Sequence, residues 1–463
     1  MKSSASESVV SISCFNGFLS INDACKCSCV SRELHRLVSS WLLSYPCHIV
    51  SSEGNLTDGV FTQWAGLSIV CLELVNCANI SDLSFYQLFP IHSKLKRLAI
   101  LGCPSLSNEI LNTLLILSSG LESIKVDRNV EHGMKNKNEL RELWLYGNTN
   151  LNSSVVWNIL DTYSDQLETV GLLNTSVNIR IKLSQLKNII LDNCTGVNDL
   201  FLKTIASDML QVAYLGSGAV CSETGLQDFG NKCPALKEFG VSGNRTGTVC
   251  SFDTILCNCP IEKLSLQDNK GVSYNISYQV KQFCKLTHLN LSGCEMIDNK
   301  CAEFFATESL VEVEVAGTNI GNVGLKHICK TCTRLKRLNI SKCPKLTDEG
   351  ILAIPKWSRY IQCLVLRWSS HMTLLPIEEM VDENFFLSLI DLTGCIQVRP
   401  MDAIVLARRA KSRIKIILVE GVYIAPGKKN VATPTEQVHR HNKGKKKKKK
   451  EKLCSISVEQ GVM

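Results

Sequence analysis

The sequence lacks the features that membrane insertion, secretion or catalysis would need. No run approaches the roughly 18 apolar residues of a membrane span, and the polar residues 1–8 are not followed by the apolar core of a secretion signal. It contains no phosphate-binding glycine loop, no nucleophile elbow and no paired-carboxylate motif in a suitable context. We therefore expect a soluble, intracellular chain that is not an enzyme and carries no cofactor or metal.

A repeated phrase dominates the rest of the chain. An apolar residue is followed by two variable residues, a second apolar residue, one variable residue, a third apolar residue and two more variable residues, and the phrase ends in Cys, Asn or a small residue. Clear copies lie at 95–103, 286–294, 335–343 and 387–395. Aligning the last position gives 15 candidate repeats, mostly 24 to 27 residues apart, with two steps of only 19. These positions are Cys77, Cys103, Asn129, Asn148, Thr175, Cys194, Gly218, Asn244, Asn269, Cys294, Thr318, Cys343, Ser369, Cys395 and Val422.

Each repeat can be interpreted physically. The alternating apolar residues predict a half-buried strand. The Cys or Asn fills the turn that follows, and a Ser, Thr or Asn with nearby acids starts a helix, as at Thr347-Asp348-Glu349. The two 19-residue steps are too short for a full helix, so we expect a single turn or an extended crossing there.

The period and the phrase are those of a leucine-rich repeat. We therefore predict an α/β fold, a leucine-rich-repeat solenoid (horseshoe) over residues 49–424. Stacked repeats share one continuous core, which no single repeat could bury alone.

Many of the 23 cysteines follow the repeat, and six occupy the phrase-ending position itself. This placement indicates packing of reduced thiols, as expected inside cells. Cys329 and Cys332 form the one CxxC motif. With no second pair at zinc-ligand spacing, we interpret it as packing, against the alternative of metal or redox chemistry.

The positive charge is concentrated near the end. Residues 428–452 contain 11 Lys or Arg against two acids, a charge of +9, which leaves the rest of the chain at −1. The run Lys445, Lys446, Lys447, Lys448, Lys449 and Lys450 predicts a disordered tail over 425–463. It could serve nuclear or nucleolar targeting, weak contact with RNA or acidic surfaces, or solubility. The near-neutral repeats argue against other nucleic-acid binding. We expect a cytoplasmic and/or nuclear protein.

Outward-pointing strand residues form the predicted binding surface on the concave face. As partner contacts we single out Trp144, Tyr146, Tyr214, Arg97, Arg337 and Arg367. Trp144 and Tyr146 are either a binding hot spot or rings that pack on each other and on neighbouring strands. The mixture of both charge signs favours a protein ligand.

Residues 1–48 are the predicted helical cap. Leu19-Ser20-Ile21-Asn22-Asp23 and Val30-Ser31-Arg32-Glu33-Leu34 resemble the second half of an F-box, and the repeats resemble those of the F-box/leucine-rich-repeat (FBXL) family. The resemblance implies that Phe18, Leu19, Ile21, Asp23, Val30 and Leu34 bind a Skp-type adaptor. The family's opening Leu-Pro-x-Glu helix has no counterpart in 1–17. The F-box is thus divergent, incomplete at its start, or retained only as a solenoid end.

The family resemblance also implies a function. The chain would be the substrate-recognition subunit of an SCF-type cullin–RING ubiquitin ligase, with adaptor, cullin and a protein substrate as partners. The alternative is a ligase-independent leucine-rich-repeat scaffold or regulator. A third, more remote reading is an RNA- or ribosome-associated factor acting through the lysine tail.

Overall fold

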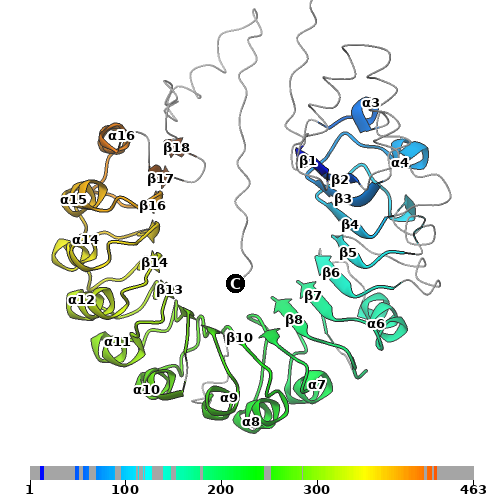
Figure 1. Cartoon of the computed structure of the whole chain (residues 1–463), viewed down its shortest axis with the longest axis horizontal. Coiled ribbons are helices and arrows are strands. Elements are labelled where there is room, and N and C mark those ends of the chain that lie inside the picture. Colours follow the sequence, from blue (N-terminus) through cyan, green and yellow to red (C-terminus); the bar gives the residue numbers. More distant parts are fainter. Residues whose placement is uncertain are drawn as a thin grey trace, which may run out of the picture. The chain divides into compact units, whose positions relative to one another are not determined.

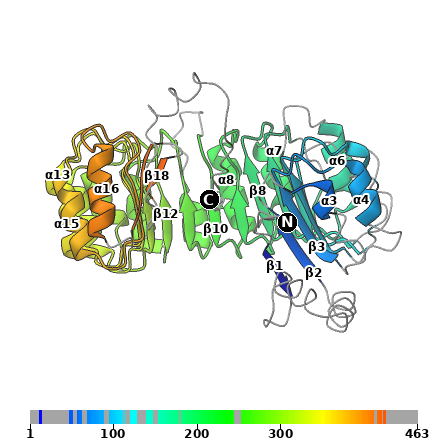
Figure 2. The same cartoon turned by 90° about the horizontal axis from the view of Figure 1, so that it is seen from above.

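The structure is a computed structural model. It describes residues 11–14, 47–51, 56–61, 69–88, 95–110, 113, 118, 120–127, 139–146, 153–177, 181–243, 252–283, 285–410, 414–419 and 422–424. The described residues fall into two compact units, which divide between Val197 and Asn198. Each unit layers strands against helices, and Figures 1 and 2 show the strands of each unit on one side and its helices on the other.

Unit 1 is a parallel sheet of strands β2 to β8, joined at one edge by the antiparallel strand β1. Its strands are β1 (Ser11–Cys14), β2 (Cys47–Ser51), β3 (Ile69–Val75), β4 (Arg97–Leu101), β5 (Ser123–Val126), β6 (Glu142–Tyr146), β7 (Thr169–Leu173) and β8 (Asn188–Asp192). Its helices are α3 (Asp58–Phe61), α4 (Asp82–Leu88) and α6 (Ser153–Thr162).

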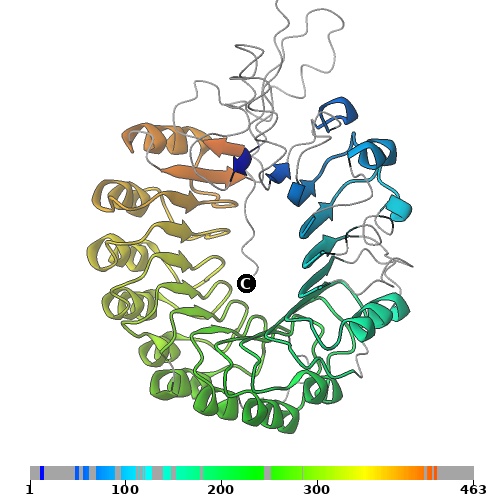
Figure 3. The same ribbon diagram turned by 45° about the vertical axis from the view of Figure 1, so that its right-hand side comes forward.

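Unit 2 is a more regular parallel sheet of strands β9 to β17, joined at the end by the antiparallel strand β18. Figure 3 shows its strands side by side. The strands are β9 (Val212–Tyr214), β10 (Glu238–Gly240), β11 (Lys263–Ser265), β12 (His288–Asn290), β13 (Glu312–Glu314), β14 (Arg337–Asn339), β15 (Cys363–Val365), β16 (Leu389–Asp391), β17 (Lys415–Val419) and β18 (Val422–Ile424). The helices are α7 (Asp199–Ile205), α8 (Glu223–Lys232), α9 (Asp253–Asn258), α10 (Tyr274–Phe283), α11 (Asn299–Phe305), α12 (Asn322–Thr331), α13 (Asp348–Ile351), α14 (Ala353–Trp357), α15 (Leu375–Glu383) and α16 (Pro400–Arg409).

The core of each unit lies between its sheet and its helices. The central residue of each strand from β9 to β16 is buried there, for example Leu289 in β12 and Leu338 in β14. Helices contribute the opposite wall, for example Leu325 and Ile328 of α12. Strand, turn and helix recur in the predicted order, and the prediction of an α/β leucine-rich-repeat solenoid is confirmed.

The cysteine that ends the repeated phrase links neighbouring repeats. The thiol of Cys294 donates to the carbonyl of Leu266 at 2.9 Å, and that of Cys395 donates to Leu366 at 3.0 Å. Asn269 occupies the same position and donates its Nδ2 to the carbonyl of Val241 at 2.7 Å. Each side chain thus satisfies a carbonyl that the preceding strand leaves free as the chain turns away. Cys and Asn are therefore interchangeable in the pattern because both can donate.

The acids at helix starts link repeats as well. The Asp199 carboxylate accepts hydrogen bonds from the backbone N–H of Ser222 at 2.8 Å and from its hydroxyl at 2.5 Å. Asp348 holds Thr373 in the same way. Sequence reasoning assigned these acids to the helix dipole alone. Their second role orders the start of the next helix, and Thr347 makes no side-chain cap hydrogen bond to its own helix.

The structure agrees with most of the predicted strand positions and differs at both ends of the repeat region. Strands β3 to β16 precede the first fourteen predicted positions in order, but Val422 begins the antiparallel strand β18 instead of filling a turn. The pattern also missed β2, which pairs in parallel with β3. The described residues between β7 and β8 contain no helix, as the 19-residue step predicts. Residues 11–14 of the expected helical cap form a strand. The F-box-like segment and the tail lie outside the described residues, so the three-part domain division stays a prediction.

Candidate protein-binding face

Strand alternation creates an exposed surface on each sheet. Leu289 points into the core, so its neighbours His288 and Asn290 project from the opposite side, which we call the open face. Because the strands are parallel and in register, equivalent residues form rows across the open face. In unit 2 one row contains Glu238, Lys263, His288, Glu312 and Arg337.

The first part of this row is an ion-paired network. Lys263 Nζ lies 2.8 Å from Glu238 Oε1, and the Tyr214 hydroxyl donates to Glu238 Oε2 at 3.2 Å. The Tyr214 ring lies over Gly240 on the next strand, where an added Cβ would come 2.3 Å from ring atom Cδ1. Tyr214 is only 9% exposed, and burial beside Glu238 raises the pKa of its hydroxyl. The predicted contact residue is thus on the open face but mostly covered.

The middle of the row concentrates carboxylates around one arginine. Arg337 Nε lies 2.8 Å from Glu312 Oε1 and 3.5 Å from Glu314 Oε1. Burial, partly offset by Arg337, raises the pKa of Glu312, while burial lowers the pKa of His288, whose Nε2 lies 3.6 Å from Glu312 Oε2. His288 is therefore biased towards its neutral form. The charges here are largely satisfied by one another.

Arg367 lies towards the other end of the unit 2 sheet. Its Nε donates to Asp391 Oδ2 at 2.6 Å, and its own side chain is 55% exposed. The backbone N–H and hydroxyl of Thr393 donate to Asp391 Oδ1, so the carboxylate is fixed before it meets the arginine. Arg367 presents a positioned guanidinium to the solvent.

In unit 1 the open face carries the aromatic pair. The rings of Trp144 and Tyr146 stack with centroids 6.3 Å apart and planes at 17°. The Trp144 indole covers Gly171 on the next strand, where an added Cβ would lie 2.0 Å from ring atom Cε3. Its Nε1 donates to Glu142 Oε1 at 2.6 Å, and Lys125 Nζ lies 5.3 Å from its centroid. Both rings are half-buried, so they pack on the sheet and still present area to a ligand.

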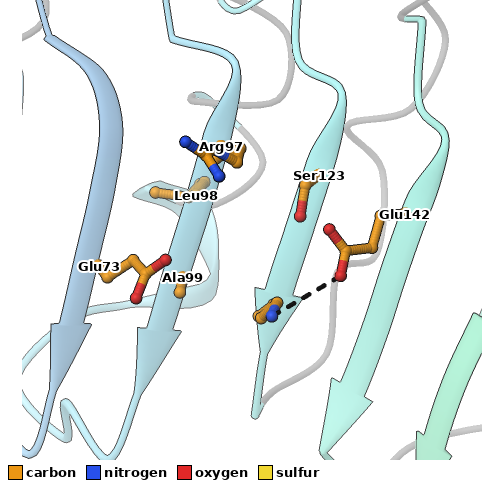
Figure 4. A pocket seen from close by; sticks show the side chains of 7 residues that line it. Glu73, Arg97, Leu98, Ala99, Ser123 and Glu142 are labelled. Carbon is orange, nitrogen blue, oxygen red and sulfur yellow. Dashed lines mark ion pairs between the residues drawn. The ribbon is translucent and has the colours of Figure 1, made fainter. Parts of the chain in front are cut away.

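A small pocket opens beside these rings on the same face, shown in Figure 4. Arg97, Lys125 and Glu142 provide its charges, with Lys125 Nζ 3.7 Å from Glu142 Oε1. Glu73 and Ser123 complete the polar lining, and Leu98 and Ala99 provide its apolar part. Sequence reasoning identified Arg97 but missed Glu73, Ser123 and Glu142, although the same strand alternation could have found them.

The cysteines belong to the core and not to this face. Burial raises the pKa of Cys294, Cys329 and Cys332 to about 12. A thiol that stays protonated is a poor nucleophile and a poor metal ligand. The CxxC pair therefore fits the packing interpretation. In the parts of the chain that the structure describes, no three His, Cys, Asp or Glu residues converge as a metal site.

The structure brings together two of the predicted contact residues, Trp144 and Tyr146, and places Arg97 two strands away in the same unit. Tyr214, Arg337 and Arg367 lie on the open face of unit 2. Whether any of them contacts a partner stays a prediction. Phe18, Leu19, Ile21, Asp23, Val30, Leu34 and Lys445 to Lys450 lie outside the described residues. No helix among those described is both long and apolar enough to cross a membrane.

Comparison with known proteins agrees with this architecture. A family model described as Leucine Rich repeat matches residues 284–306 and 331–354. F-box/LRR-repeat protein 4 of Bos taurus is 25% identical over 169 residues, which are 36% of this chain and 24% of that protein. The chain thus spans about a quarter of the length of the curated relative it matches.

A solved yeast structure has a similar fold. A chain in the crystal structure of the yeast Rad7 and Elc1 complex aligns with a TM-score of 0.50 and 16% identity, over 79% of this chain and 84% of its own length. An internalin from Listeria monocytogenes aligns with a TM-score of 0.38 and 14% identity, over 64% of this chain and 80% of its own. The chain is therefore an α/β leucine-rich-repeat protein. Part of its repeat region is similar to that of an F-box/LRR-repeat protein.

Proposed function

We propose that the chain is the substrate-recognition subunit of an SCF-type ubiquitin ligase. In this proposal the open face holds a protein substrate, and the segment 18–37 binds a Skp-type adaptor that connects to a cullin. The likeness to an F-box/LRR-repeat protein supports the ligase assignment. The fold shared with a chain solved in complex with another protein is consistent with a protein partner.

The observation that carries substrate binding is the Trp144–Tyr146 stack beside the pocket of unit 1. Large, partly exposed rings held rigidly by a sheet are typical of binding hot spots, because little side-chain freedom is lost when they are covered. Positive Arg97 and Lys125 lie on the two middle strands of the pocket, and negative Glu73 and Glu142 lie on the strands either side of them. Such mixed charge suits a protein surface better than a polyanion.

In this proposal the chain positions its partners and does not itself catalyse a reaction. Holding a substrate and an adaptor on one polypeptide raises the effective concentration of the substrate near the ubiquitin-charged enzyme. Specificity would come from the arrangement of paired charges on the open face, since a partner with the wrong charges would leave them unpaired on burial.

A reconstitution experiment with the full chain tests the proposal. We expect the purified Skp-type adaptor to bind at micromolar concentration, and the double substitution Leu19→Asp/Ile21→Asp to abolish this binding. Trp144→Ala/Tyr146→Ala is the matched control, because it alters the open face and should leave adaptor binding unchanged. Failure of the unaltered chain to bind the adaptor would reject the ligase assignment. A chain that binds other proteins without the adaptor would then act as a scaffold.

The lysine run is proposed to direct the chain to the nucleus. Deleting residues 440–452, or replacing Lys445 to Lys450 with Gln, should move a fluorescent fusion out of the nucleus. The Gln variant keeps the length of the tail and removes only its charge. An unchanged distribution of both variants would contradict a targeting role.

A further inference from the structure

A second surface of unit 2 lies away from the open face, at the edge of the sheet where the strands begin. Four aromatic residues are exposed here. Trp357 ends α14, Tyr360 lies in the turn from α14 into β15, and Phe385 and Phe386 lie in the turn from α15 into β16. The Tyr360 and Phe386 rings lie 5.5 Å apart between centroids. Phe385 is 75% exposed, although a side chain of this size is usually at least half covered.

The same edge carries cations that form no ion pair with the residues that the structure describes. Lys330 and Lys356 place their ammonium groups 5.1 and 5.4 Å from the Trp357 ring. Arg334 and Arg359 are exposed on the turns before β14 and β15. Within the described ranges none of these four cations forms an ion pair, whereas the cations of the open face do. We call the four aromatic residues and these four cations the basic–aromatic rim.

The rim is held by buried hydrogen bonds beneath it. Asn384 is fully buried directly before Phe385, and its Nδ2 donates to the carbonyl of Ser358 at 2.9 Å. The hydroxyl of Ser358 in turn donates to the carbonyl of Cys329 at 3.3 Å. These bonds connect α12, α14 and α15, which lie next to one another in Figure 1. The exposed rings therefore project from fixed turns, which lowers the entropic cost of binding.

We propose that the basic–aromatic rim is a second docking site, whose ligand is an acidic protein segment that carries apolar side chains. Acidic residues would complement the four unpaired cations, and apolar side chains would cover Phe385, Phe386 and Tyr360. The chain's own lysine-rich tail is excluded as the occupant by its like charge. This site does not depend on the ligase assignment, since it uses neither the open face nor the F-box-like segment.

A nucleic acid fits the rim less well than an acidic protein. The Trp357 face that would stack on a base is occupied by two ammonium groups. The Tyr360 and Phe386 rings are already tilted against each other at 41°. Glu383, which is exposed two residues before Phe385, would repel a phosphate backbone. An acidic peptide can avoid Glu383 by the placement of its own charges.

Selection from a phage-displayed library of random peptides on the immobilised full chain tests the site. The charge variant is Arg334→Glu/Arg359→Glu, and the aromatic variant is Phe385→Ser/Phe386→Ser. The matched control, Lys232→Glu/Lys345→Glu, reverses two exposed cations elsewhere in unit 2. All positions are on the surface, and circular dichroism would verify that each variant is folded.

We expect the selected peptides to be rich in Asp, Glu and large apolar residues. Both rim variants should weaken their binding by about tenfold or more, since exposed anchors of this kind dominate interface affinity, while the control keeps the affinity. Selected peptides that lack acids, or that bind the rim variants equally well, would overturn the proposal. A labelled single-stranded oligonucleotide serves as a second probe. The proposal would also be overturned if the oligonucleotide bound the full chain and lost affinity in the rim variants while the peptides kept theirs.

Discussion

The open faces of the two units are built differently from the same repeat. In unit 2, strands of three residues present alternating charges that pair across neighbouring strands, as Glu238 does with Lys263 and Glu312 with Arg337. In unit 1, the strand β6 has five residues and carries a stacked Trp144–Tyr146 pair beside a polar pocket. The comparison indicates that unit 2 holds its charged side chains in fixed positions by mutual pairing. Unit 1 instead offers half-buried aromatic area.

One feature is shared, namely an aromatic ring lying over a glycine of the next strand. Substituting Ala for that glycine should lower the free energy of unfolding by different amounts in the two units, and this is the largest difference we expect between them. Gly240→Ala pushes Tyr214 away from Glu238 and should destabilise by about 2–3 kcal/mol, because the ring is only 9% exposed. Gly171→Ala should cost less, about 1–2 kcal/mol, since the half-exposed Trp144 can swing into solvent.

Urea unfolding of the two glycine variants measures this difference. Trp144→Ala in the Gly171→Ala background is the control, because removing the ring should relieve the clash. Equal losses of unfolding free energy in Gly240→Ala and Gly171→Ala would contradict the difference between the covered Tyr214 ring and the half-exposed Trp144 ring.

The carboxylate pair of unit 2 provides a pH-dependent comparison. Arg337→Ala should destabilise by about 1–2 kcal/mol near neutral pH, since it leaves the mostly buried Glu312 and Glu314 charged and without their cation. The pKa of Glu312 is already raised and would rise further without Arg337. Protonation at lower pH removes the charge, so the loss should shrink as pH falls through that raised pKa. Glu312→Gln should remove most of this pH dependence, and a loss independent of pH would contradict the assignment.

The buried thiols predict a loss of stability at alkaline pH. The pKa of Cys294 is raised to about 12, above the ordinary value of 9.0. A raised pKa means that the contribution to stability is complete below the ordinary value and is lost as pH rises towards the folded value. Between these two pKa values, each such thiol should lower the free energy of unfolding by about 1.4 kcal/mol per pH unit.

Cys294→Asn tests the alkaline prediction, because Asn269 already occupies the equivalent position. Chemical denaturation at about pH 8 and pH 10 should show a smaller alkaline loss in this variant. In native protein a thiol reagent should modify the exposed Cys257 much faster than Cys294. Rapid modification of Cys294 without unfolding would contradict its burial.

The smallest expected effect is that of an exposed ion pair in unit 1. Lys96 Nζ lies 2.7 Å from Glu122 Oε1, with both side chains well exposed. Lys96→Ala should change the free energy of unfolding by less than about 0.5 kcal/mol, because solvent screens such pairs. A loss as large as that of Arg337→Ala would show that burial does not distinguish the two units.

Sequence alone predicted the repeat architecture because the spacing of the apolar residues gives the repeat period. It located strands β3 to β16 and the turn position that residues such as Cys294 fill. It missed β2, since that strand does not carry the full phrase, and it took Val422 for a turn position because an antiparallel pairing has no signal in a parallel repeat.

The open face was harder to predict. Alternation identifies which residues face outward, as for Arg97 and Arg337, but not which neighbours cover them. Tyr214 looks exposed in the sequence and is nearly buried, because a glycine 26 residues later lets its ring lie flat. The basic–aromatic rim was also missed. Its members come from successive turns and adjoin only when the repeats stack.

We propose that the chain recruits proteins through its open face. Affinity purification with mass spectrometry, comparing the full chain with Trp144→Ala/Tyr146→Ala, tests it most directly. We predict that the Skp-type adaptor and a cullin co-purify with both, while a subset of other proteins is lost only from the double variant. Absence of adaptor and cullin from both samples, with an unchanged set of other partners, would contradict the account.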